Sequence, residues 1–159
     1  MMTANQITDL WERRIGAEVR ALYCADLASL LAVRKQWITG LSFFFSSGAV
    51  AMLVARGPLW VPTLLTALVA VMTAYSVAVG LDAKIRTMAK LHYSWSTLSA
   101  EYVRLWDSTY SEDAIPKLDD LIRREQALSE LAATDAPNDQ TRMARWQDHV
   151  FQQYHLVVA

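Results

Sequence analysis

The side chains that most often carry enzyme chemistry are scattered along this 159-residue chain. His92, His149 and His155 lack partners at ligand spacing, because a helical metal-binding pair is separated by four residues. The sequence has no glycine-rich phosphate loop, no pair of cysteines and no serine-hydrolase motif. A solvated helix face is the expected place for four acidic residues: Glu101, Asp119, Asp120 and Glu125. We therefore expect no catalytic residue, no metal, no cofactor and no enzyme activity.

The informative chemistry lies in two uncharged stretches, residues 37–55 and 59–81, where small side chains recur every four residues. In the second stretch these are Thr66, Ala70, Ala74 and Ala78, with Thr73 and Ser76 nearby; in the first they are Ser47, Ala51 and Ala55. Small residues at this spacing let membrane helices approach closely, and hydroxyl groups bond across the contact. The two faces pack either against each other or against further copies of the chain. We favour self-association, in a ring lined by Thr66, Thr73 and Ser76.

Both stretches have the length and composition of membrane-spanning helices. A bilayer core about 30 Å thick needs roughly 20 apolar residues in a helix, and neither stretch contains a charged residue. The alternative is a helical hairpin inside a soluble core, which would need burial on all sides by about 115 remaining residues. Because Arg56-Gly57-Pro58 forms a tight turn between the stretches, the sequence predicts a two-helix transmembrane hairpin over residues 37–81.

Basic residues flank this hairpin mainly at its two outer ends. They are Arg34 and Lys35 before the first stretch and Lys84, Arg86 and Lys90 after the second, whereas the connection holds Arg56. Since basic residues stay on the cytoplasmic side, we expect both termini in the cytoplasm and the chain in the cytoplasmic (inner) membrane. The expected interface anchors are Arg34, Lys35, Trp37 and Trp60.

Charged helical segments precede and follow the hairpin. Residues 1–36 are an expected N-terminal cytoplasmic helix, capped at Thr8 or Asp9 after frayed residues 1–5, that runs directly into the first span. Residues 82–159 are an expected C-terminal cytoplasmic helical region, which continues the second span without a break. Its leucines repeat every seven residues at positions 91, 98 and 105. This period is typical of a helix packed lengthwise on another, and we expect the N-terminal helix to be its antiparallel partner.

Two shorter helices complete the predicted fold. Ser111-Glu112-Asp113 caps the first, and Ala136-Pro137-Asn138-Asp139 separates it from a final helix over residues 141–155. Asp26, at the edge of the N-terminal helix's apolar face, either pairs with a basic residue of a neighbouring helix or, more commonly for such an acid, is solvated. The predicted fold class is an all-α membrane protein, in which the hairpin is continuous with a cytoplasmic bundle of a long antiparallel pair and two short C-terminal helices.

Three features together have a familiar layout: Arg34-Lys35-Gln36-Trp37 at the entry to a span, a Ser/Gly/Phe-rich stretch over residues 41–49, and a long helix ending in Leu105-Trp106. This layout, over residues of about 8 to 132, resembles the SLATT family of two-transmembrane effectors from prokaryotic conflict and anti-phage systems. The resemblance implies a cytoplasmic-membrane effector that forms pores or otherwise disrupts the membrane when a partner sensor or a nucleotide signal commands it. Because the chain has no evident nucleotide-binding domain, the sensor would be a separate protein.

We therefore expect a membrane effector that oligomerises through its transmembrane hairpin to form a pore or disrupt the cytoplasmic membrane in anti-phage defence. Its partners would be the lipid bilayer, further copies of itself, and a separate sensor or nucleotide-signalling protein. A net charge of −1 argues against a nucleic-acid partner. Two alternatives stay open: a passive membrane anchor or scaffold that recruits a soluble partner, and a holin-like lysis protein.

Overall fold

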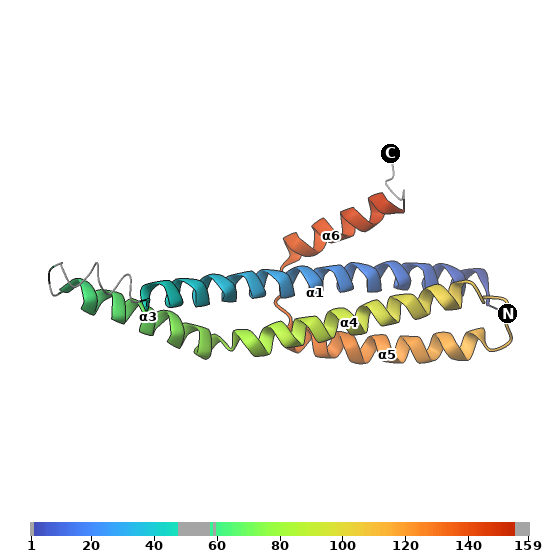
Figure 1. The fold of residues 1–159 in the computed structure, drawn as a ribbon. Helices are drawn as coiled ribbons and strands as arrows, with labels where there is room; N and C mark the ends of the chain where they lie inside the picture. The colour runs from blue at the N-terminus through green and yellow to red at the C-terminus, as the bar shows by residue number, and fades with distance from the viewer. Residues whose placement is uncertain (1, 48–57, 59, 155–159) are drawn as a thin grey trace. The chain divides into compact units, whose positions relative to one another are not determined.

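The computed structural model of the chain describes residues 2–47, 58 and 60–154, and over these residues the secondary structure is helical, without a strand. The helices are α1 (Ala4–Phe45), α3 (Trp60–Val79), α4 (Leu81–Trp106), α5 (Ala114–Asp135) and α6 (Gln140–Gln153) (Figure 1). The predicted all-α class is confirmed. The chain forms two compact units, which we name the bundle unit (Met1–Leu27 with Thr87–Ala159) and the apolar unit (Ala28–Arg86).

Helix α1 begins earlier than the sequence patterns suggested. The backbone N–H of Thr3 donates to Oε1 of Gln6 at 2.8 Å, and the backbone N–H of Gln6 donates to Oγ1 of Thr3 at 3.4 Å. This reciprocal pair is a capping box, which satisfies N–H groups at the helix start. The predicted caps at Thr8 or Asp9 were therefore wrong, and residues 4 and 5, which were predicted to be frayed, are helical. Thr8 lies inside α1, where its hydroxyl donates to the carbonyl of Ala4 at 3.2 Å.

The other end of α1 also differs from the prediction. The helix runs unbroken to Phe45, as expected for a helix that enters the first uncharged stretch, but it does not reach Ala55 as one helix. The backbone N–H of Ser47 donates to the carbonyl of Phe44 at 3.1 Å, and the hydroxyl of Ser46 donates to the carbonyl of Ser42 at 2.8 Å. The bond from Ser47 spans three residues and tightens the last turn of α1. The hydroxyl of Ser46 competes for a backbone carbonyl of the same turn. The remainder of the predicted span, residues 48–55, lies outside the described residues.

A single glycine separates α3 from α4, where the sequence suggested an unbroken helix. Gly80 has φ +62°, a left-handed conformation that costs glycine little and other residues more. Its backbone N–H donates to the carbonyl of Val77 at 3.1 Å, and its carbonyl accepts from the backbone N–H of Lys84 at 3.0 Å. The prediction of continuity was wrong at this residue, and α3 and α4 are distinct helices.

The predicted antiparallel pairing of the N-terminal helix with α4 is confirmed within the bundle unit. The rings of Trp11 and Trp106 lie 5.2 Å apart between centroids, and Nδ1 of His92 lies 2.9 Å from the carbonyl oxygen of Ala21. The sequence predicts an apolar and aromatic seam on α4, and six of its side chains are buried: Met88, Leu91, Trp95, Leu98, Tyr102 and Leu105. Its two outermost members, Ile85 and Trp106, are half-buried. The heptad-like spacing of the seam reflects this lengthwise packing.

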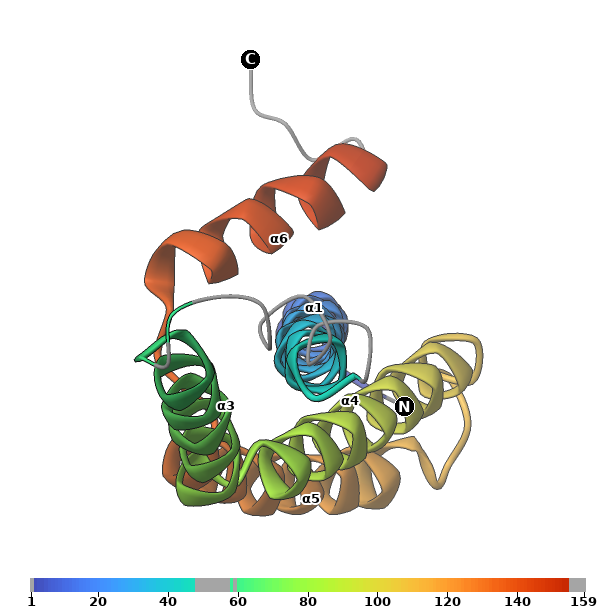
Figure 2. The ribbon, with the colours of Figure 1, turned by 60° about the vertical axis from the view of Figure 1, so that its left-hand side comes forward.

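The two predicted C-terminal helices are also present, as α5 and α6. Helix α5 lies beside α4 in both ribbon views, whereas α6 lies on the other side of α1 (Figures 1 and 2). Asp139 caps α6 by accepting a 3.0 Å hydrogen bond from the backbone N–H of Arg142. Val150 is the buried residue of α6 and forms a small core with Ile15 and Val19 of α1. Partly buried side chains of both helices also pack against this core: Trp11, Leu22, Met143, Trp146, Phe151 and Tyr154. Apolar and polar contacts together attach α6.

Candidate functional site

Helix α3 is an apolar and largely exposed helix. It has 20 residues, no charged side chain and no buried residue. The helical run that starts at Trp60 contains an 18-residue window with a mean hydropathy of 2.1, of which 6% is buried. By length and composition, it is the one helix of the described structure that is long and apolar enough to cross a membrane. A core helix of a soluble protein would be mostly buried, and α3 is not.

The two faces of α3 have different surroundings. Half-buried residues recur at positions 61, 65, 69, 72, 76 and 79, which share one side of a helix. The small residues predicted for oligomerisation are, apart from Ser76, on the exposed side: Thr66, Ala70, Thr73, Ala74 and Ala78. We call these five residues the small-residue face. In the described structure, packing within one chain leaves this face uncovered, whereas Ser76 faces the chain's own interior.

The hydroxyl groups of the small-residue face bond within their own helix. Thr66 donates to the carbonyl of Pro62, and Thr73 donates to the carbonyl of Val69, both at 2.9 Å. The two hydroxyl groups therefore already donate their hydrogens within α3. The face presents methyl groups and these hydroxyl oxygens, which suits close contact with another helix. From the first stretch, Ser47 is half-buried, and Ala51 lies outside the described residues.

The predicted interface residues differ in their contacts within the apolar unit. Trp37 and Trp60 are 67% and 65% exposed, in contrast to the buried Trp95 of the bundle unit. The guanidinium carbon of Arg34 lies 5.4 Å from the centroid of the Tyr75 ring, a cation–π contact. Lys35 forms an ion pair with Asp82 at the start of α4. The predicted anchor Lys35 is thus paired with Asp82, an acid for which the sequence predicted no partner.

A buried carboxylate joins three helices in the bundle unit. Glu125 of α5 accepts hydrogen bonds from Arg13 at 2.9 Å, from Arg20 at 2.7 Å and from the hydroxyl of Tyr102 at 2.9 Å. Arg20 also lies over the Trp95 ring, 4.9 Å from its centroid. We name Arg13, Arg20, Tyr102 and Glu125 the Glu125 cluster. Burial raises the pKa of Glu125, but the hydrogen bonds from both arginines and from Tyr102 outweigh burial and hold its pKa below the usual range.

The Glu125 cluster overturns the prediction that Glu125 belongs to a solvated face, since only 8% of its surface is exposed. A signal for this burial exists in the sequence. Leu118, Leu121 and Glu125 follow one another at intervals of three and four residues, which places them on one face of α5. An acid on an apolar stripe needs a basic partner, and the bundle supplies Arg13 and Arg20 from α1.

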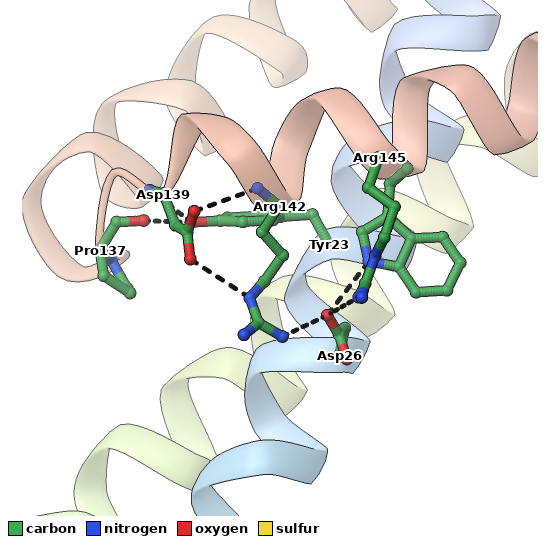
Figure 3. A network of polar contacts seen from close by, with 7 residues as sticks. Tyr23, Asp26, Pro137, Asp139, Arg142 and Arg145 are labelled. Carbon is green, nitrogen blue, oxygen red and sulfur yellow. Dashed lines mark hydrogen bonds and ion pairs between the residues drawn. The ribbon is translucent and has the colours of Figure 1, made fainter.

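A second carboxylate fastens α6 to α1 (Figure 3). Oδ2 of Asp26 accepts hydrogen bonds from Arg142 at 2.6 Å, from Arg145 at 2.8 Å and from the indole N–H of Trp146 at 3.2 Å. We name these four residues the Asp26 cluster. Burial raises the pKa of Asp26, but the hydrogen bonds from Arg142 and Trp146 lower it by more. The net pKa is therefore below its usual value. Asp26 is thus paired, the less common of the two readings of the sequence.

Tyr23 of α1 holds the segment just before α6. Its hydroxyl donates to the carbonyl of Pro137 and accepts a hydrogen bond from the backbone N–H of Asp139 at 3.2 Å (Figure 3). At the far end of α6, Tyr154 donates to Glu18 at 2.9 Å and accepts from Arg14 at 3.2 Å. Helix α6 is therefore tied to α1 at both ends by hydrogen bonds of tyrosine side chains.

No group of three or more His, Cys, Asp or Glu side chains in the described ranges is arranged to hold a metal ion. Cys24 is buried, and burial raises its pKa to about 11, so the thiol is protonated at neutral pH. The chain matches none of the protein-family models, curated proteins or solved structures with which it was compared.

Proposed function

We propose that this chain is a membrane effector whose apolar unit inserts into the cytoplasmic membrane and self-associates to form a pore or to disrupt the bilayer. In this proposal residues 37–55 and 59–81 are the two spans of a hairpin, and both termini lie in the cytoplasm. Two spans of one chain cannot enclose a pore, so conduction would require several copies.

The observation that carries the proposal is the exposure of the small-residue face on α3. Lipid tails are as apolar as leucine, so helices in a membrane associate chiefly through close packing of small residues. Thr66, Ala70 and Ala74 are exposed, and no contact among the residues that the structure describes buries them. A second copy is the partner with a matching face, since every copy presents the same residues.

The test is the membrane potential of a bacterial host, followed by a voltage-sensitive dye while the protein is induced at graded levels. We expect depolarisation with a steep dependence on expression, because pore assembly needs several copies. Ala70→Leu and Ala74→Leu should abolish it, since each adds bulk where helices must approach. Ala83→Leu, the same change at an exposed residue beyond the predicted span, is the matched control and should depolarise normally.

Other outcomes separate the alternatives. Membrane insertion without depolarisation, at any level and with all variants alike, would contradict the pore and leave a passive anchor that recruits a soluble partner. Full activity of both Ala70→Leu and Ala74→Leu would contradict assembly through α3. Lysis when a phage endolysin is co-expressed would favour the holin-like reading. The role in anti-phage defence and the separate sensor or nucleotide-signalling partner rest on the SLATT resemblance, and phage plating efficiency on induced cells tests them.

A further inference from the structure

A groove of about 690 Å³ lies between α1 and the beginning of α4 within the apolar unit. This volume falls within the range of roughly 300–1,000 Å³ that small-molecule sites occupy. Lys35 and Asp82 line it together with Thr39, Gly40 and Phe43. The groove therefore combines a pair of opposite charges with apolar wall residues.

The charged residues of this groove are accessible. The Lys35 and Asp82 side chains form an ion pair, yet they remain 40% and 64% exposed. A ligand with one negative and one positive group can join such a pair, placing its anion at Lys35 and its cation at Asp82. Charge complementarity thus favours a zwitterionic ligand over a simple anion, which Asp82 would repel.

The apolar part of the groove extends along α1, away from the charges. With a rise of about 1.5 Å per residue, Gly40 and Phe43 lie about 8 and 12 Å along the helix from Lys35. A Cβ added at Gly40 would meet no atom within 4 Å, and the Phe43 side chain is 78% exposed. Gly40 therefore leaves open space beside the exposed Phe43 ring, where a hydrocarbon chain can lie against the surface of α1.

The order of these groups along the groove is that of a phospholipid, from charged headgroup to acyl chain. The proposed spans begin after Lys35 and end before Asp82, so both charges lie at headgroup level if the proposed function is right, and this inference rests on it. The geometry points to a bound phospholipid of the phosphatidylethanolamine class. Its phosphate lies at Lys35, its ammonium donates to Asp82, and one acyl chain follows Gly40 and Phe43.

Lipid retention by the full-length protein tests this site. The protein is purified in mild detergent, mixed with phosphatidylethanolamine, phosphatidylcholine or phosphatidylglycerol of identical chains, and examined by native mass spectrometry. Because the choline headgroup has no N–H to donate to Asp82, we expect about threefold higher retention of phosphatidylethanolamine than of phosphatidylcholine, the scale of an exposed charge pair. Water-soluble glycerophosphoethanolamine in excess should not displace the lipid, since it lacks the acyl chains.

Two pairs of variants divide the site into its parts. Asp82→Asn should abolish the preference for ethanolamine and raise retention of anionic phosphatidylglycerol, whereas Lys35→Gln should lower retention of all three lipids. Gly40→Leu should occupy the space beside Phe43 and abolish retention, and Gly40→Ala, which meets no neighbour, should retain the lipid. Equal retention of ethanolamine and choline lipids by the unaltered protein, or unchanged retention by Gly40→Leu, would overturn the inference.

Membrane fractionation of the unaltered protein separates the lipid site from the proposed function. If the unaltered protein sediments with membranes but shows no headgroup preference, the lipid site is wrong and the membrane insertion on which the proposed function depends is retained. If the unaltered protein is absent from the membrane fraction, both proposals are wrong.

Discussion

Tyr102 of α4 donates its phenolic hydrogen to Glu125 of α5 at 2.9 Å, and both side chains are buried. The same carboxylate accepts hydrogen bonds from two arginines of α1. One side chain therefore provides the acceptor for donors on two other helices. The bundle unit is held by this polar centre as well as by its apolar seam.

The first prediction concerns the stability of the bundle unit. Glu125→Ala leaves the buried hydroxyl of Tyr102 without its acceptor and removes one partner from each of Arg13 and Arg20. We expect the free energy of unfolding to fall by about 2–4 kcal/mol. Glu101→Ala is the control, because it removes a more exposed ion pair with Arg124 and should cost less than about 1 kcal/mol. Urea unfolding of the detergent-solubilised protein measures both, and equal losses would contradict the prediction.

The second prediction concerns acid stability. Since the pKa of Glu125 is held below its ordinary value of 4.5, the folded state binds its proton less readily than the unfolded state. Its contribution to stability is therefore complete above about pH 4.5 and is lost as the pH falls through the lower folded pKa. Glu125→Gln, which cannot titrate, should be less stable than the unaltered protein at pH 7 and should show a shallower loss of melting temperature in acid. If the melting temperatures of the two proteins fell in parallel from pH 7 to pH 3, this assignment of the pKa of Glu125 would be wrong.

The third prediction concerns the attachment of α6. Asp26→Ala removes the acceptor for Arg142, Arg145 and Trp146 while leaving the small apolar core in place. We expect faster amide hydrogen exchange in α6 and unchanged exchange in α5, because Arg142, Arg145 and Trp146 all belong to α6. Asp148→Ala, at an exposed position of α6, serves as the control and should exchange like the unaltered protein. Uniform acceleration throughout the bundle unit would show that Asp26 supports the whole fold instead.

The fourth prediction concerns the break between α3 and α4. Gly80→Ala places a side chain at φ +62°, which costs roughly 1–2 kcal/mol, so the backbone should relax toward a continuous helix. Spin labels at Leu68 and Lys84, both exposed, should then move farther apart. Gly80→Asn is the control, because asparagine tolerates the left-handed conformation, and it should preserve the original distance. An unchanged distance in Gly80→Ala would mean that packing enforces the break.

Much of the fold could be predicted because it depends on local periodicity. Leu91, Leu98 and Leu105 indicated the lengthwise packing of α4, and Pro137 marked the end of α5. The capping box at Thr3 and Gln6 was also present in the sequence as a Thr-x-x-Gln pattern. The break at Gly80 could not be predicted in this way, because a single glycine within an apolar run is compatible with a continuous helix.

The polar clusters were harder to predict because they depend on tertiary contacts. Arg13 and Glu125 lie 112 residues apart, and Asp26 and Trp146 lie 120 residues apart. A charged residue on a helix is usually solvated. The signals to the contrary were the position of Glu125 on the apolar stripe of α5 and that of Asp26 at the edge of the apolar face of α1. The small-residue face could be located from sequence, but its exposure depends on which side of α3 packs within the chain.

The Glu125 cluster also limits how the chain can evolve. Loss of the carboxylate alone would leave two arginines and a buried hydroxyl without a shared acceptor, so the four residues should change together or not at all. Distant homologues are then expected to keep two basic residues seven positions apart on the first helix, with a tyrosine and an acid 23 residues apart on the later helices. This covarying quartet would identify relatives whose apolar units have diverged beyond sequence similarity.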